Sequence, residues 1–320
     1  MAPNGTRNRK AATPVREEAA YLIQHDPDDH TQQRQQMLLK RWDELPLWQQ
    51  EDNHFIETGY RPASGSLRKS FESWAYLHNE SVNIYSHLIG SVLFAVLPIY
   101  IFRTEIPPRY KVATSADLGV CSIYFAGVAI CFLLSATFHT IMNHSPKMDK
   151  LGMQLDFQGV ILLMWGATVP LIYYGFYCDK KMQWVYWSLL STFAIACSVV
   201  TMQPRFSDPF LRPIRAATFG SLAFSSIIPV VHGIIKYGWV LQSQRMGLKW
   251  VLVTLGLNTL GASAYAIKFP ERWFRKTFDI FGASHQWLHI MVLLAGLAHV
   301  MGILTAFDFL HAHPNECRAP

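Results

Sequence analysis

The chain has 320 residues, of which 51% are hydrophobic, 13% aromatic and only 16% charged. Ordinary soluble domains carry about 25% charged residues, so this composition excludes a typical soluble globular protein and indicates a membrane protein. The net charge of +6 lies mostly in short loops and in the N-terminal segment, where it bears on membrane orientation rather than on nucleic-acid binding.

The N-terminal segment is polar and precedes every apolar run. Residues 1–35 hold few aliphatic side chains, so they cannot bury enough surface to fold and we expect them to be disordered. Residues 35–50, "QQMLLKRWDELPLWQQ", are amphipathic, and their Leu and Trp side chains suit a bilayer surface, a partner or the bundle itself. No signal-peptide core opens the chain, so the first span would direct insertion.

Seven runs with few or no charges follow, each about 18 to 25 residues long, which is enough to cross the hydrocarbon core as a helix. They predict an all-α fold, a seven-transmembrane helix bundle without internal repeats. We divide the chain into a largely disordered segment 1–58, a membrane domain 59–310 and a short extracytosolic tail 311–320. The runs cover residues 84–102, 118–142, 153–177, 184–203, 216–235, 250–267 and 287–307.

Basic residues in alternate loops indicate the orientation of the bundle. They are slightly in excess on the side of the N-terminus, which favours a cytosolic N-terminus. Glycosylation sequons begin at Asn4, Asn79 and Asn143. With a cytosolic N-terminus all three would stay unmodified.

The five cysteines show no CxxC spacing, and three of them lie inside apolar runs, where a thiol behaves as a small hydrophobic group. We therefore expect neither a disulfide framework nor a cysteine-rich metal site. The residues are Cys121, Cys131, Cys178, Cys197 and Cys317.

Four metal-competent residues are predicted at one end of the bundle. His139 lies near the end of the second span, Asp156 near the start of the third, and His285 and His289 at the start of the seventh. Because successive spans alternate in direction, these three ends lie on the same side of the membrane. Ionisable groups at membrane depth are costly, so their convergence indicates a functional site.

The spacing of "HQWLH" places His285 and His289 on one helix face, where a third histidine, His139, would complete a His₃ zinc site with one open position. The alternative is a pair of ordinary interfacial histidines. Gln286 stands where the soluble HExxH zinc proteases have glutamate, so any general base must come from elsewhere. Asp156 is the candidate base, and Ser135 lies one helical turn from His139 on the same face.

Other polar residues in the spans have structural interpretations. Glu80, Asn83 and His87 form one helical stripe that suits polar packing against neighbouring helices, and we leave them out of the metal set as structural support. His232 and His299 have no metal-competent partner at matching depth, so we expect each to make a helix–helix hydrogen bond.

Five motifs in order resemble the progestin and adipoQ receptor family, which includes adiponectin receptors, haemolysin-III-type proteins and fungal proteins tied to zinc and sterol homeostasis. The resemblance runs from about Gly59 to Phe309 and covers all seven spans. The motifs are "GYRP" at 59–62, "ExxNxxxH" at Glu80, Asn83 and His87, "SATFH" at 135–139, "LDFQG" at 155–159 and "SHQWLH" at 284–289.

The resemblance implies a cytosolic N-terminus, a topology opposite to that of G-protein-coupled receptors. It implies zinc held by His139, His285 and His289, with Asp156 contacting the zinc-bound water. It further implies a lipid-accessible cavity and, for the adiponectin-receptor branch, hydrolysis of ceramide-type lipids. The partners would be membrane lipids and an extracellular protein ligand, in the plasma membrane or an endomembrane.

Zinc-activated water suits amide hydrolysis, with Asp156 moving the proton and Ser135 hydrogen-bonding the developing oxyanion or the substrate. A second hypothesis is a receptor in zinc or sterol homeostasis in which zinc is purely structural. A transporter or channel fits less well, because no chain of acidic residues crosses the spans.

Overall fold

The computed structural model describes residues 38–313 apart from 51–52, 104–108, 204 and 206–207, together with Cys317. Seven of its helices are long and apolar enough to cross a membrane, which confirms the predicted all-α, seven-span fold. They are α4 (Ser81–Arg103), α5 (Ser115–Ile141), α6 (Pro146–Gly175), α7 (Lys180–Thr201), α8 (Arg212–Tyr237), α10 (Leu248–Ile267) and α11 (Ser284–Ala312). The shorter helices are η1 (Trp42–Glu44), α3 (Leu67–Glu72), η2 (Ser73–Ala75), η3 (Arg109–Lys111), η5 (Pro209–Leu211) and α9 (Trp239–Arg245).

Several helices begin outside the apolar runs, because capping residues rather than hydropathy set their ends. Helix α6 begins at Pro146 instead of residue 153, and the Ser145 hydroxyl accepts a hydrogen bond from the Met148 amide. Proline suits the first helical position, where its missing N–H is not needed. In α5, Thr114 and Asp117 form a reciprocal capping box. The hydropathy pattern thus locates the spans, and the polar caps extend them.

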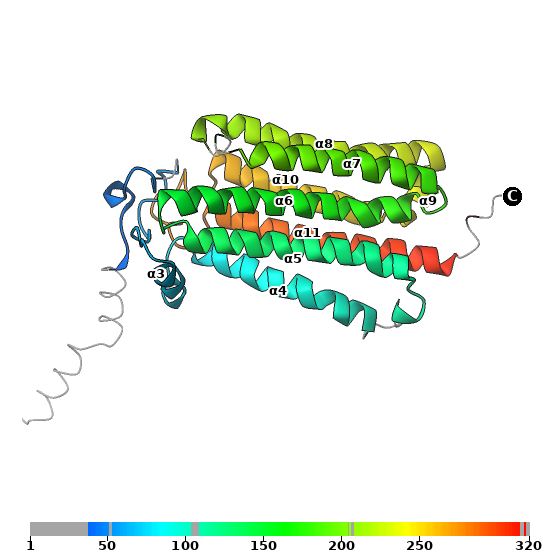
Figure 1. Cartoon of the computed structure of the whole chain (residues 1–320), viewed down its shortest axis with the longest axis horizontal. Coiled ribbons are helices and arrows are strands. Elements are labelled where there is room, and N and C mark those ends of the chain that lie inside the picture. The colour runs from blue at the N-terminus through cyan, green and yellow to red at the C-terminus, as the bar shows by residue number, and fades with distance from the viewer. Residues whose placement is uncertain are drawn as a thin grey trace, which may run out of the picture.

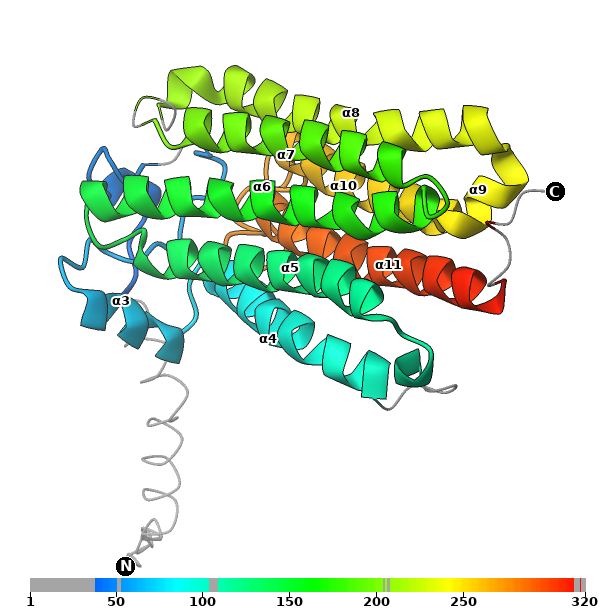
Figure 2. The same cartoon turned by 45° about the vertical axis from the view of Figure 1, so that its right-hand side comes forward.

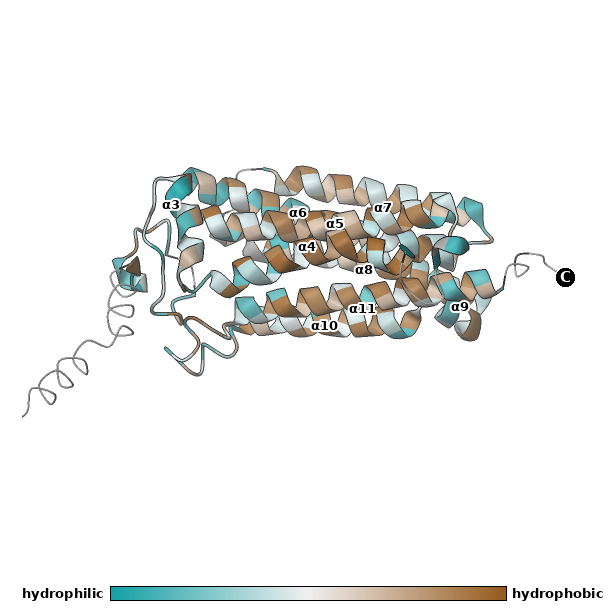
Figure 3. Ribbon diagram, turned by 90° about the horizontal axis from the view of Figure 1, so that it is seen from below, coloured by the Kyte–Doolittle hydropathy of each residue, from teal (hydrophilic) through white to brown (hydrophobic). Residues whose placement is uncertain are grey.

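The long helices run side by side along one axis (Figures 1 and 2). The starts of α4, α6, α8 and α11 and the ends of α5, α7 and α10 share the end that carries α3, which we call the N-terminal end. Helix α11 ends at the opposite end of the bundle, which we call the C-terminal end. Apolar residues follow the length of the helices, and polar residues gather toward their ends (Figure 3).

Helices α5 and α6 pack closely through glycines. A Cβ atom added to Gly159 would lie 2.9 Å from the Cα atom of Cys131, closer than packed atoms tolerate. Small residues permit such close approach of membrane helices. By contrast, only 6% of the apolar window of α10 and 17% of that of α8 are buried. The bundle therefore has a tightly packed α5–α6 side and a side that exposes α8 and α10 to lipid.

Residues 38–50 and 53–80 fold against the N-terminal end of the bundle. Leu45, in the amphipathic stretch, is buried against Ile56, Tyr60 and Ala283, whereas Leu47 is 86% exposed. Of the three interpretations of that stretch, the structure supports packing on the bundle for Leu45. The expected disorder of residues 1–35 falls outside the described residues.

The expectation that the cysteines form no disulfide is wrong for one pair. Cys178, in the loop between α6 and α7, is bonded to Cys317, with an S–S distance of 2.06 Å. The end of α6 and the end of α11 reach the same end of the bundle, which brings together residues 139 positions apart. The remaining cysteines, Cys121, Cys131 and Cys197, are buried free thiols, as expected.

Candidate metal centre

The structure brings three histidines together at the N-terminal end. One ring nitrogen from each of His139, His285 and His289 lies within 4.8 Å of the other two. The ring centroid of His139 lies 5.0 Å from that of His285 and 4.8 Å from that of His289. His139 and His289 are buried and His285 is partly buried. This is the convergence that helix alternation and the i,i+4 spacing predicted.

The start of α11, which carries two of the histidines, is held by buried polar groups. Glu271 accepts hydrogen bonds from the backbone N–H of Ser284 at 2.8 Å and from the Ser284 hydroxyl. An acidic group suits the N-terminus of a helix, where N–H groups lack partners. These contacts fix the residue immediately before His285.

Gln286 has a structural role in this region. Its amide donates to the carbonyls of Asn79 and Ile280, at 3.1 and 2.7 Å, and its oxygen accepts from the N–H of Gly282. The side chain that replaces the glutamate of HExxH therefore ties the start of α11 to the segment before α4. Gln286 therefore has a structural role and is not a candidate for the catalytic base.

Glu80 orients His139. Its carboxylate lies 2.7 Å from Nδ1 of His139 and accepts a second hydrogen bond, also 2.7 Å, from the Asn83 amide. Burial raises the pKa of Glu80, but the charge and hydrogen bond of His139 outweigh it and hold the pKa well below its usual range. With Nδ1 donating to a carboxylate, Nε2 of His139 is left as the atom for a metal. Glu80 and Asn83 belong to the stripe predicted from the sequence as structural support, but this contact with His139 was not predicted.

His87, the third residue of that stripe, packs against the site without joining the group of three. Its ring lies between Phe132, at a centroid distance of 4.5 Å, and His289, at 3.8 Å, and both pairs are stacked. The stacked rings of Phe132 and His87 thus support the ring of His289. The supporting role expected for His87 stays a prediction.

Asp156 and Ser135 lie beside the histidines. The two side chains hydrogen-bond to each other, and the charge of Asp156 acts on His139. Ser135 is buried, and Asp156 does not belong to the metal-competent group. The carboxylate therefore lies near His139 but outside the group of three imidazoles.

The "GYRP" motif supports the site through Arg61, a role that sequence reasoning missed. The buried Arg61 guanidinium donates to the backbone carbonyls of His139 at 2.5 Å and Thr140 at 3.0 Å. Burial lowers the pKa of Arg61 to about 10, with Glu80 opposing the shift, so the group stays charged near neutral pH. A cation at a helix C-terminus satisfies carbonyls that lack helical partners. Arg61 thus fixes the end of α5 that carries His139.

The two histidines expected to join helices do so. His232 Nδ1 lies 2.7 Å from the Tyr186 hydroxyl, and His299 Nε2 lies 3.0 Å from the Ala167 carbonyl.

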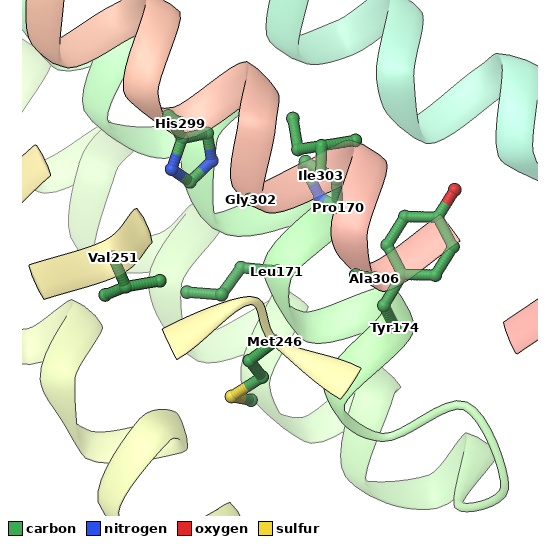
Figure 4. A pocket seen from close by; sticks show the side chains of 9 residues that line it. All are labelled: Pro170, Leu171, Tyr174, Met246, Val251, His299, Gly302, Ile303 and Ala306. Atoms are coloured by element: carbon green, nitrogen blue, oxygen red, sulfur yellow. The ribbon is translucent and has the colours of Figure 1, made fainter. Parts of the chain in front are cut away.

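A small cavity of about 10 Å³ lies beside His299 between α6 and α11, with Met246 and Val251 also in its lining. Its lining is mainly aliphatic, and the Tyr174 hydroxyl points away from the other labelled side chains (Figure 4). This pocket lies away from the three histidines and offers no comparable set of metal ligands.

Comparisons with known proteins agree with the motifs. The family model described as haemolysin-III related matches residues 75–300. The chain is 38% identical to an adiponectin receptor protein of Drosophila melanogaster over 86% of its length, spanning 61% of that protein. It is 36% identical to an ADIPOR-like receptor of Saccharomyces cerevisiae over 85% of both chains. A heptahelical transmembrane protein of Arabidopsis thaliana is 28% identical, with coverage of 87% and 90%.

These matches confirm the resemblance found in the motifs, and the matched region includes all three histidines of the centre. The chain therefore belongs to the haemolysin-III related family of membrane proteins, in which proteins named adiponectin receptors are among its relatives.

Proposed function

We propose that this membrane protein binds one zinc ion through His139, His285 and His289 and hydrolyses the amide of ceramide-type membrane lipids. The observation that carries the proposal is the meeting of three imidazoles, two buried and one partly buried, with a carboxylate near His139 at one end of the bundle. Three protein ligands with a neighbouring general base are typical of catalytic zinc sites.

The donor set fits zinc in its chemistry. Imidazole nitrogen is a common zinc ligand, and the carboxylate of Glu80 on Nδ1 of His139 is the arrangement that fixes the tautomer of a zinc-bound histidine. When bound, zinc lowers the pKa of a water molecule toward neutrality and polarises a carbonyl.

The chain itself supplies the proton transfer. The Asp156 carboxylate accepts a proton from the attacking water, whose oxygen joins the acyl carbon, and returns the proton to nitrogen as the amide C–N bond breaks. Ser135 hydrogen-bonds to Asp156, so it orients this carboxylate in addition to binding the substrate or its oxyanion. Fatty acid and sphingoid base would leave as products.

The exposed faces of α8 and α10 and the position of the histidines near the helix ends favour a substrate that arrives within the bilayer. The relatives' receptor names support a parallel role in lipid signalling, with an extracellular protein ligand as a further proposed partner.

A receptor with a purely structural zinc is the alternative. The metal would then join α5 to α11 through the same histidines. Structural zinc sites usually have four protein ligands, and the metal-competent group among the described residues contains three. A group of three ligands rather than four favours a catalytic zinc site over a structural one. A transporter or channel remains the weaker candidate.

The disulfide supports a cytosolic N-terminus. Cys178 and Cys317 are joined at the C-terminal end of the bundle, and disulfides persist in oxidising compartments. We therefore place that end outside the cytosol and the metal centre near the cytosolic face, in the plasma membrane or an endomembrane. Antibody access to a tag after Pro320, but not to an N-terminal tag, on intact cells would support this orientation, and the reverse pattern would contradict it.

Turnover of a labelled ceramide by the purified chain tests the proposed reaction. Asp156→Ala should retain zinc but lose roughly 10²-fold or more in rate, the usual scale of a general base. Asp149→Ala, which removes a carboxylate from the same helix near its start, is the matched control and should keep its activity. Equal rates in the parent and Asp156→Ala would remove Asp156 from the mechanism. No turnover in the zinc-loaded parent would favour the structural-zinc receptor.

A further inference from the structure

The segment between α10 and α11 exposes a group of aromatic side chains beside the metal centre. Phe269, Trp273, Phe274 and Phe281 are 47%, 56%, 56% and 56% exposed. They follow directly after α10, the span with the least buried surface. Aromatic side chains at this level, just beyond a span, suit the boundary between the hydrocarbon core and the headgroups.

The exposed charges of the same segment are all positive. Arg272, Arg275 and Lys276 are exposed, and both acidic residues between 268 and 281, Glu271 and Asp279, are buried. Glu271 accepts hydrogen bonds from Ser284 and Asn53, and Asp279 accepts one from Thr58. Lys276 lies 3.4 Å from Glu57, so one of the three cations is partly neutralised.

Helix α3, at the same end of the bundle, provides a comparison. It also exposes apolar side chains, Leu67 and Phe71, both 47%. Its Arg68, however, lies 2.8 Å from Glu72 within the helix. Apolar exposure is therefore common to both elements. Beyond its ion pair α3 has one exposed cation, Lys69, whereas the α10–α11 segment has two, Arg272 and Arg275.

We propose that residues 268–281 form a binding surface for anionic phospholipid headgroups, with the aromatic side chains in the interface and the cations on the phosphates and carboxylates. Charge complementarity selects this occupant, since basic residues beside a leaflet attract its anionic lipids. The surface does not depend on the hydrolase proposal.

The surface is rigidly joined to the metal centre. Glu271, in the middle of the segment, holds the backbone of Ser284 at 2.8 Å, and Ser284 precedes His285. At the start of the segment, the Lys268 ammonium lies 4.0 Å from the centre of the Tyr265 ring, which lies 4.9 Å from the His285 ring. Bound headgroups would thus be held next to the histidines, enriching anionic lipid at the site.

The test uses the full-length chain in phosphatidylcholine vesicles containing a trace of spin-labelled lipid. The fraction of label immobilised by the protein reports association, and we expect labelled phosphatidylserine to associate roughly threefold or more better than labelled phosphatidylcholine. The triple variant Arg272→Gln/Arg275→Gln/Lys276→Gln should lose most of this preference, and 1 M salt should weaken it in the parent.

A matched triple variant at the C-terminal end, Arg103→Gln/Lys181→Gln/Lys249→Gln, replaces three exposed basic residues and should keep the preference. Equal association of both labels with the parent would overturn the proposal. An equal loss of preference in the two triple variants would also overturn it, because net charge rather than this segment would then be responsible. Far-UV circular dichroism measured on the same samples shows whether each variant keeps its helical content.

Discussion

The contact between Glu80 and His139 predicts a specific loss of metal affinity when the carboxylate is neutralised. In Glu80→Gln the side chain keeps its shape and can still accept hydrogen bonds from His139 and from Asn83. It loses the negative charge, which lies 2.7 Å from Nδ1 of His139 and is buried. A buried charge is screened little by solvent, so its removal makes the imidazole a weaker ligand.

The expected magnitude follows from comparable partners of metal-bound histidines, whose loss usually weakens metal binding about 10- to 100-fold. This corresponds to about 1.4 to 2.7 kcal/mol of binding free energy. The measurement is the zinc dissociation constant of the purified chain, determined by competition with a chelator of known affinity.

Asp279→Asn is the control for this experiment. Asp279 is also a buried carboxylate at the N-terminal end, and it accepts hydrogen bonds from Thr58 at 2.9 and 2.7 Å. This variant should lose stability without changing the zinc dissociation constant of the folded chain. A dissociation constant for Glu80→Gln within twofold of the parent value would refute the role assigned to Glu80.

Three further predictions concern packing, redox state and pH. Gly159→Ala should destabilise the chain by about 1–3 kcal/mol, because its Cβ would meet the α5 backbone at 2.9 Å. Gly220→Ala, with nothing within 4 Å of the added Cβ, should be neutral or slightly stabilising in thermal unfolding, and equal effects would contradict the close packing of α5 on α6. A reducing agent should lower the Tm of the parent and of Cys197→Ser but not of Cys178→Ser, and the same response in all three would argue against the disulfide. Burial lowers the pKa of His78 to about 3. The unfolded chain therefore binds a proton at a higher pH than the folded chain, so the free energy of unfolding should fall as the pH drops from about 6.5 toward 3. His78→Asn should reduce this dependence of Tm on pH, and an unchanged dependence would remove His78 as its source.

The fold and the depth of the histidines follow from local features of the sequence. Each span is a continuous apolar run, and alternation of spans fixes which ends meet. The i,i+4 spacing of His285 and His289 then requires only that the helix forms. These predictions depend on helix geometry alone, which explains why His139 could be assigned to the same end without a structure.

The contacts that orient the site depend on the folded N-terminal segment and were not predictable in the same way. Arg61 reaches the end of α5 across 78 positions in sequence, and Glu80 reaches His139 across 59. Neither pairing follows from a helical period. Two signals were available in the sequence: the "GYRP" motif and Glu80, an acidic residue just before a span. Glu80 was interpreted only as part of a packing stripe with Asn83 and His87.

The disulfide was missed for a related reason. Spacing rules identify cysteines that are close in sequence, whereas Cys178 and Cys317 meet because α6 and α11 end on the same side of the bundle. The same alternation argument that joined His139 to His285 would have placed these two cysteines together. Applied to Cys178 and Cys317, the alternation of spans would have predicted that the two cysteines lie at the same end of the bundle.

Elemental analysis of the purified chain tests the central claim most directly. The parent should contain about one zinc per chain, as a site formed by a single set of three histidines requires. The double variant His285→Ala/His289→Ala, which leaves His139 with no second imidazole from the group, should contain almost none while retaining its helical content. Stoichiometric zinc in that double variant would contradict the assignment of the metal centre.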